Sequence, residues 1–283
     1  MLTAVGDDPE GHQIMELCRL RGVSTEWIAV MPLLPDERGT HCKNGTASWQ
    51  YVENGRPAEY FNRDALDCPM DRMFREERAE LSHFLQSASN DTVLVVSGIA
   101  SSRPSSDATL ARMLDLIGSA RKQGAFVIVD PNTRLRLFES GDHAKRRLQA
   151  LFQLADMVLP SVPHEVTDVS PWPLDELVRD SMFELGVREI ILKKGPAGSV
   201  YYGRDGRSHL HPAPNIGDPN SSGAGDAYVG GVALALCQGL SIEQAMAVAT
   251  LAAAGKLRTK GSATLAPEFA PNIAQVQASL LHS

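Results

Sequence analysis

The segment NSSGAGDAYVGG, residues 220–231, joins a turn-rich stretch to an apolar helix and places small residues around a single acid, Asp226. A helix that starts near Gly223 exposes backbone N–H groups that carry the positive end of the helix dipole. Glycines allow an anion such as a phosphate to come close to these donors. The segment therefore predicts an anion cradle at a helix N-terminus, with one carboxylate a turn inside the helix.

The position of Asp226 has two interpretations. Beside an anion cradle, its carboxylate could accept the proton of a bound hydroxyl group, as phosphoryl transfer to an alcohol requires. Alternatively, the segment is an N-cap followed by close helix packing, and Asp226 is a first-turn acid favoured by the helix dipole. Short glycine motifs do not separate these interpretations, so the rest of the chain has to be considered.

Short β-branched runs alternate with helical patterns before this segment. Strands are predicted at residues 91–98, 125–132, 156–160 and 188–195, with helices at 105–124, 143–155 and 174–186 between them. A hairpin around residues 203–206 follows, and then two helices rich in small residues, 223–240 and 241–258. The alternation is typical of parallel βαβ units and of a sheet covered on both faces. Further helices are predicted at 11–23 and 271–281, and residues 24–65 are interpreted as a small β lid.

The composition excludes several classes of partner. The 283 residues carry a formal net charge of -7, and the Lys and Arg residues are spread along the chain, so we expect no nucleic-acid partner. The four cysteines are far apart, which is typical of reduced thiols in a cytoplasmic protein. We expect no membrane segment, because the chain has no long apolar run. The histidines lack metal-ligand spacing, so no transition-metal site is predicted.

The segment at 220–231 resembles the DTTGAGD motif of the PfkB carbohydrate kinases, the family with the ribokinase fold. Three other stretches resemble that family in the expected order: residues 5–25, 92–100 and 191–202. The resemblance implies a ribokinase-like three-layer α/β/α fold, with a mainly parallel doubly wound sheet and a small β lid. It also implies a single kinase domain over residues 1–283, with the lid at roughly 24–65. About forty residues that open the family are expected to be missing from this chain.

The resemblance assigns roles to individual residues. Asp226 would be the catalytic base, and the amides of Gly223, Ala224 and Gly225 would form the anion hole for the transferred phosphoryl group. Lys193, Gly195 and Gly198 would lie along the phosphates or ribose of ATP, although the two glycines also fit an ordinary hairpin turn. The helix at 252–255 would lie near the adenine. The further candidates on the nucleotide side are Ser161, Glu165, Ser222 and Asn132.

Two stretches narrow the choice of acceptor substrate. VDPNTRLRLF, residues 129–138, is similar to the DPNxRxxLW segment of the 2-keto-3-deoxygluconate kinases and places Arg134 between acceptor and phosphates. EYFNRDA, residues 59–65, resembles their YYWR segment, which makes Tyr60 and Arg63 candidates for sugar-acid binding. A guanidinium group suits a carboxylate because its donors match two oxygens. The alternative is that Arg134 lies at a solvated helix start and that Arg63 is a surface cation.

These observations predict an ATP-dependent kinase that acts on a sugar or sugar acid, most specifically 2-keto-3-deoxygluconate. Mg2+ is expected only with ATP, held mainly by phosphate oxygens and water. One alternative keeps the kinase and changes the acceptor to fructose, ribose or a nucleoside. Another is a non-catalytic relative that binds sugar or nucleotide, because Asn220 stands where the family motif begins with Asp. A homodimer through the lid is also considered.

Overall fold

The computed structural model describes residues 1–32, 46–51, 57–62, 69–102, 106–162, 175–217 and 223–259. For residues 46–51, 57–62, 136 and 175 the description covers the backbone alone. The contacts divide the chain into two compact units, which are described separately. Unit 1 comprises residues 1–89, 101–123 and 136–140, and unit 2 comprises residues 90–100, 124–135 and 141–283.

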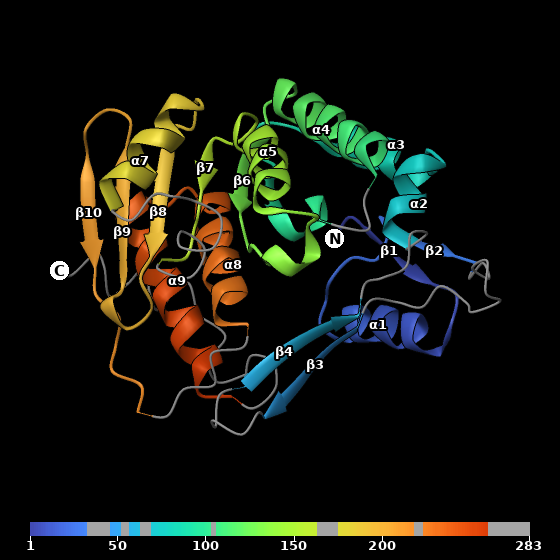
Figure 1. Ribbon diagram of the computed structural model, residues 1–283, viewed down its shortest axis with the longest axis horizontal. Helices are drawn as coiled ribbons and strands as arrows, with labels where there is room; N and C mark the ends of the chain where they lie inside the picture. Colours follow the sequence, from blue (N-terminus) through green and yellow to red (C-terminus); the bar gives the residue numbers. More distant parts are fainter. Residues whose placement is uncertain are drawn as a thin grey trace. The chain divides into compact units, whose positions relative to one another are not determined.

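Unit 2 is built on a sheet that has six strands in the described residues. They are β5 (Val93–Ser97), β6 (Phe126–Asp130), β7 (Met157–Val158), β8 (Glu189–Lys193), β9 (Ser199–Gly203) and β10 (Ser208–His211). They lie in the order β10-β9-β8-β7-β6-β5 (Figure 1). The pairs from β5 to β8 are parallel, whereas β9 is antiparallel to both β8 and β10. The predicted parallel units and the predicted hairpin are both confirmed.

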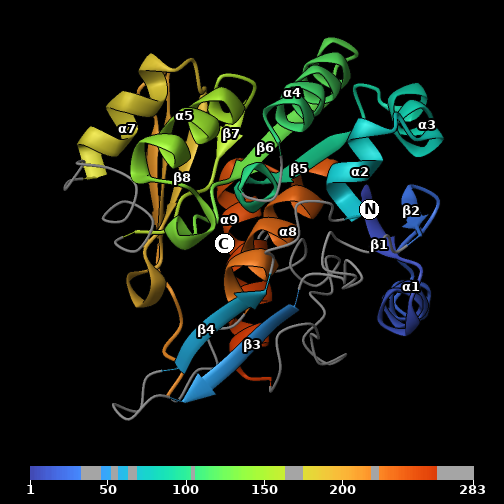
Figure 2. The same ribbon diagram turned by 45° about the vertical axis from the view of Figure 1, so that its right-hand side comes forward.

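Helices cover both faces of this sheet. Helices α5 (Gly141–Phe152) and α7 (Asp175–Glu184) lie on one face, and α8 (Ala224–Cys237) and α9 (Ile242–Leu257) lie on the other (Figures 1 and 2). In β8 the fully buried Ile191 belongs to the core cluster that includes Val232 and Met246 of α8 and α9. Its neighbours Ile190 and Leu192, which point to the opposite face, are also fully buried. The strand is therefore apolar on both faces, and the predicted three-layer α/β/α arrangement is confirmed.

Unit 1 contains a second parallel pair and four helices in its described residues. Strand β1 (Thr3–Gly6) pairs in parallel with β2 (Ile28–Met31), and α1 (Pro9–Leu20) connects them. The remaining helices are α2 (Pro69–Arg75), α3 (Ala79–Ser87) and α4 (Asp107–Lys122). Strands β3 (Thr46–Tyr51) and β4 (Pro57–Asn62) form an antiparallel pair within the predicted lid. Strand β2 also falls within the predicted range of roughly 24–65, and its Ile28, Ala29 and Met31 are buried in the strand that pairs with β1. The lid itself stays a prediction.

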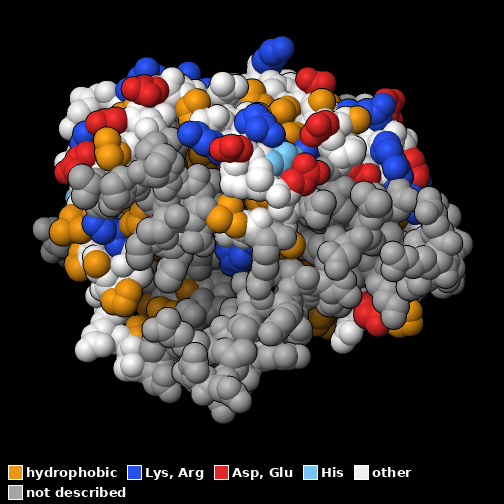
Figure 3. Space-filling view, viewed as in Figure 1, with side chains coloured by type: hydrophobic (Ala, Val, Ile, Leu, Met, Phe, Trp, Pro, Cys, Tyr) orange, Lys and Arg blue, Asp and Glu red, His pale blue; other side chains and the backbone are white. Residues whose placement is uncertain are grey.

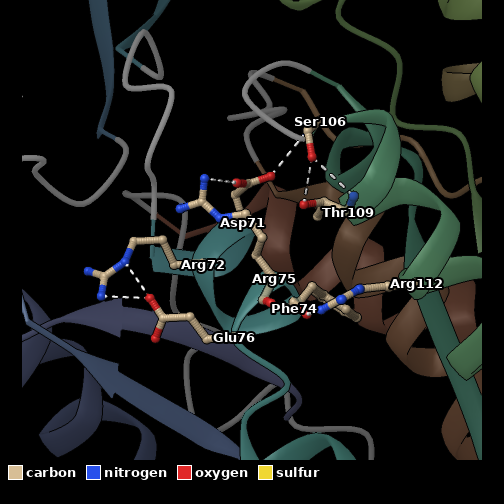
Figure 4. A network of polar contacts seen from close by, with 8 residues as sticks. All are labelled: Asp71, Arg72, Phe74, Arg75, Glu76, Ser106, Thr109 and Arg112. Carbon is tan, nitrogen blue, oxygen red and sulfur yellow. Dashed lines mark hydrogen bonds and ion pairs between the residues drawn. The ribbon is translucent and has the colours of Figure 1, made fainter.

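A polar network joins α2 to α4 in unit 1 (Figure 4). The buried Asp71 carboxylate accepts a hydrogen bond from the backbone N–H of Ser106 at 3.1 Å, and Ser106 in turn caps α4 by accepting from the N–H of Thr109. Arg112 donates from Nη1 to the carbonyl oxygens of Phe74 at 2.8 Å and Arg75 at 2.7 Å, near the end of α2. The two helices thus satisfy each other's unpaired terminal groups.

Candidate active site

Three strand ends meet at the carboxyl edge of the sheet in unit 2. Strand β6 ends at Asp130 and β8 ends at Lys193, and the chain that continues from β7 reaches Ser161 between them. Ser161 and Lys193 form an isolated parallel bridge, and the N–H of Val162 donates to the carbonyl oxygen of Lys193 at 2.9 Å. Ligands of open α/β sheets bind outside the carboxyl ends of the strands, so this edge is the candidate site.

Lys193 is the centre of the described contacts at this edge. Its Nζ donates to Oδ1 of Asp130 at 3.0 Å, and both side chains are buried, with 8% and 4% of their residue surfaces exposed. The same Nζ lies 3.7 Å from the position that a Cβ atom would take on Gly225. A buried ion pair therefore lies directly against the first turn of α8. Asp130 is a site residue that the sequence analysis did not single out, although an acid at the carboxyl end of a parallel strand is a signal that could have found it.

The first turn of α8 has the geometry expected of an anion site. Gly223 is its N-cap in the left-handed conformation, with φ 77°, and its carbonyl oxygen accepts from the N–H of Ala227 at 3.0 Å. Gly223 and Gly225 bring no side chains to the amides of this turn, so an anion can approach these amides closely. Asp226 lies in the same turn with an exposed side chain. The geometry is compatible with the predicted roles of residues 223–226, which stay predictions.

A buried hydroxyl contact fixes α8 behind this turn. The Tyr228 hydroxyl lies 2.7 Å from Oγ of Ser199 in β9, and it also hydrogen-bonds the side chain of Thr250 in α9. Burial raises the pKa of Tyr228 to about 12. The contact joins the sheet and both helices of this layer two residues beyond Asp226. Sequence reasoning missed it, because a tyrosine in an apolar helix is ordinarily a core residue.

The segment after β6 holds two predicted residues, Asn132 and Arg134. Asn132 has φ 39°, which is uncommon for a residue other than glycine, and its Nδ2 donates to Oγ of Ser97 at 3.4 Å. A Cβ atom on Gly98 would collide with the carbonyl oxygen of Pro131, so the loops after β5 and β6 touch here. Arg134 is half-buried and donates from Nη1 to the carbonyl oxygen of Thr133 at 3.1 Å. Backbone conformations of this kind are concentrated at functional sites.

In the turn after β8, the two predicted glycines, Gly195 and Gly198, have different surroundings. The turn forms a short 3-10 helix, η3 (Gly195–Ala197), and is closed by hydrogen bonds from Lys194 N to Gly198 O at 2.8 Å and from Gly198 N to Gly195 O at 3.0 Å. A Cβ atom on Gly198 would collide with the carbonyl oxygen of His211 in β10, so the hairpin itself explains this glycine. Gly195 has φ 55° and open space on its Cβ side. Of the two, Gly195 is the better candidate for close approach of a nucleotide.

The other predicted site residues have no described side chains. Tyr60 lies in β4, where the description covers the backbone alone, and Arg63, Glu165 and Ser222 lie outside the described residues. The helix predicted at 271–281 lies outside them as well. The structure thus brings Asp130, Ser161, Lys193 and Gly225 together. The sugar-facing assignments of Tyr60 and Arg63 stay predictions.

The described residues contain neither a cluster of metal ligands nor a membrane-spanning helix. No group of three or more His, Cys, Asp and Glu side chains that could hold a metal ion is found among them. None of the helices in these residues is both long and apolar enough to cross a lipid bilayer. On the face shown in Figure 3, the visible Lys and Arg side chains are interspersed with Asp and Glu rather than gathered in one basic patch.

The family of the chain follows from its similarity to a known protein family. The model of the pfkB family carbohydrate kinase matches residues 1–268. The chain belongs to this family. The predicted family is therefore confirmed, and the match extends from residues 220–231 to nearly the whole chain.

The individual relatives share low sequence identity with this chain. The 2-dehydro-3-deoxygluconokinase of Dickeya dadantii is 24% identical over 277 residues, which cover 92% of this chain and 81% of that protein. Plant fructokinases match over 33%, 36% and 61% of their own length, so the matched part is less than two thirds of these relatives. An E. coli protein assigned as ribokinase II, solved in complex with ATP and Mg2+, is 20% identical and superposes with a TM-score of 0.78. That comparison covers 100% of this chain and 82% of the other and confirms the ribokinase-like fold.

Proposed function

We propose that this chain transfers the γ-phosphoryl group of ATP to a hydroxyl group of a sugar or sugar acid. The observation that carries the proposal is the joint position of Lys193 and Asp226 at the start of α8. The first brings a buried ammonium group against Gly225, and the second places an exposed carboxylate in the same turn. Membership of the pfkB family supports this reading, because its members are carbohydrate kinases.

In the proposed reaction, Asp226 accepts the proton of the acceptor hydroxyl. The hydroxyl oxygen then forms a bond to the γ-phosphorus, while the bond from that phosphorus to the β,γ-bridging oxygen breaks and ADP leaves with the electron pair. The amides of residues 223–225 and the guanidinium group of Arg134 stabilise the charge on the transferred group. Mg2+ bound with ATP would supply further charge neutralisation, held mainly by phosphate oxygens and water.

The proposed acceptor is 2-keto-3-deoxygluconate. Arg134 in the VDPNTRLRLF segment supports a carboxylate-bearing sugar, and so does the Dickeya dadantii relative, which matches over most of both chains. Fructose is the second candidate, because the plant fructokinases also match. A cytoplasmic location, a single kinase domain and a homodimer through the lid remain predictions.

The test is ATP consumption by the purified protein with a panel that contains 2-keto-3-deoxygluconate, fructose, ribose and a nucleoside. Asp226→Asn is expected to lower kcat by about 10²- to 10⁴-fold, because it removes the general base. ADP affinity, measured by calorimetry, is expected to change little in this variant. Failure of the wild-type protein with every acceptor, or full activity of Asp226→Asn, would contradict the proposal.

Glu243→Gln is the matched control. Glu243 is also an exposed first-turn acid, but it lies at the start of α9. Because α9 follows α8 after a short turn and packs against it, its start lies at the end of α8 remote from Asp226. This variant is expected to keep the wild-type kcat.

A further inference from the structure

The buried ion pair between Lys193 and Asp130 joins two strands that are not neighbours. Strand β7 lies between β6 and β8, so the Lys193 side chain crosses the end of β7 to reach Asp130. Its ammonium group is then held between two fixed features. One is the Asp130 carboxylate at 3.0 Å, and the other is the first turn of α8 at Gly225.

In this position the ammonium group interacts unfavourably with the dipole of α8. The N-terminus of a helix carries partial positive charge, which favours an anion and disfavours a cation. Burial of both charged groups also carries a desolvation cost, and replacing a buried ion pair with apolar groups often leaves stability unchanged or increased. A cation placed at the positive end of α8 is favourable only when negative charge lies beside it. Asp130 supplies that charge on one side, and a bound phosphoryl group would supply it on the other.

We propose that Asp130 is a positioning residue that holds the Lys193 ammonium against the anion site at the start of α8. The fixed positive charge then acts on the phosphoryl group together with the amides of residues 223–225. This inference rests on the proposed function, and it adds that Lys193 is directed to the transferred phosphoryl group by a carboxylate that itself touches no substrate. The strained Asn132 and the Gly98 contact to Pro131 support it, because they fix the loop that follows Asp130.

Three variants of the full chain test the role of the pair: Asp130→Asn, Lys193→Met and the double variant. Removal of an oriented charged donor from an anion site is expected to lower kcat by about 10²-fold in Lys193→Met. Asp130→Asn is expected to lower kcat by about 10-fold, because the ammonium group remains and loses only its fixed position. The KM for the acceptor is expected to stay within about 3-fold of the wild-type value in each variant, because the charge acts on the phosphoryl group.

The double variant separates positioning from a structural role. It removes both buried charges and leaves neutral groups of similar size, so its thermal midpoint is expected to recover relative to the single variants. Its kcat is expected to remain as low as that of Lys193→Met. If kcat recovers together with the thermal midpoint, the pair is structural and the proposal is wrong.

Asp156→Asn is the control for loss of a buried carboxylate. Asp156 is 6% exposed and accepts from the N–H of Val127 at 3.0 Å, near the amino ends of β6 and β7. This variant is expected to lower the thermal midpoint and to keep the wild-type kcat. An equal loss of kcat in Asp156→Asn and Asp130→Asn would overturn the specific role of Asp130.

A binding experiment keeps this test independent of the acceptor. Calorimetry with ADP and with AMP-PNP, which differ by the γ-phosphate group, needs no phosphoryl transfer. Lys193→Met and Asp130→Asn are each expected to weaken binding of AMP-PNP more than binding of ADP. If the wild-type protein phosphorylates nothing, the proposed function fails, and this contrast still decides the inference. Equal weakening of both nucleotides, or none, would overturn it.

Discussion

At the scale of single residues, Tyr228 shows how a buried polar group shapes the candidate site. It lies two residues after Asp226, so it faces a different side of α8, and its hydroxyl contacts Ser199 and Thr250. Buried hydroxyl groups without partners are costly, whereas this one is satisfied by two neighbours. The contact therefore fixes the rotation of α8, and with it the direction in which Asp226 leaves the helix.

The raised pKa of Tyr228 predicts a loss of stability in alkali. Its pKa rises from 10.0 to about 12 in the folded protein because burial disfavours the phenolate. As the pH rises from 10 towards 12, the unfolded chain loses this proton before the folded protein does. The stabilising effect of the bound proton is therefore present below pH 10 and is lost over this range. The difference between the two pKa values corresponds to roughly 2 to 3 kcal/mol.

Urea unfolding of the wild-type protein and of Tyr228→Phe, followed from pH 8 to pH 12, measures this effect. At pH 8 the variant is expected to be less stable by about 1 to 3 kcal/mol, because Ser199 and Thr250 lose a partner. Between pH 10 and pH 12 the wild-type protein is expected to lose more stability than the variant, so the two curves converge. Parallel curves would show that folding does not shift the pKa of Tyr228, and they would contradict the prediction. Other tyrosines, including Tyr201, contribute equally to both proteins.

At the scale of elements, the layer formed by α8 and α9 depends on close approach of the two helices. A Cβ atom on Gly231 would lie 2.6 Å from the Cα atom of Ala249, which is closer than real contacts allow. Its neighbour Gly230 is exposed, and a Cβ atom there would meet nothing within 4 Å. Packing against α9 therefore requires a glycine at position 231 and places no such requirement on position 230.

Alanine substitution at these two glycines is a matched comparison. Gly231→Ala is expected to destabilise the protein by about 1 to 3 kcal/mol, because the helices must move apart. Gly230→Ala is expected to be neutral or to stabilise by up to about 1 kcal/mol, because alanine has the higher helix propensity. Chemical unfolding followed by circular dichroism measures both changes. A similar effect of the two substitutions would contradict the packing described for α8 and α9.

The elements of unit 2 were largely predictable from the sequence, whereas its site contacts were not. Strands β5, β6 and β8 are short apolar runs between helical patterns, which is the usual signal of a parallel sheet. The helices α2 and α3 were not predicted. The pairing of Lys193 with Asp130 joins residues 63 positions apart and depends on the strand order, which no local pattern encodes.

At the scale of the whole molecule, each compact unit has a hydrophobic core of its own. In unit 1 the fully buried Met73 of α2 packs with Ala29 and Met31 of β2. In unit 2 the fully buried Met157 of β7 packs with Ile191 of β8 in the cluster below α8 and α9. Regions with separate cores often open as separate cooperative units, which hydrogen exchange detects. The two units are therefore expected to lose protection independently.

Met73→Ala and Met157→Ala test this independence in opposite directions. Each substitution removes a fully buried side chain and is expected to cost about 2 to 5 kcal/mol. Hydrogen exchange followed by mass spectrometry should show that Met73→Ala lowers protection in residues 1–31 and 69–87 and leaves residues 188–203 protected. Met157→Ala should show the reverse pattern. If both variants lower protection uniformly along the chain, the two units unfold as one. The candidate site in unit 2 would then depend for its stability on the core of unit 1.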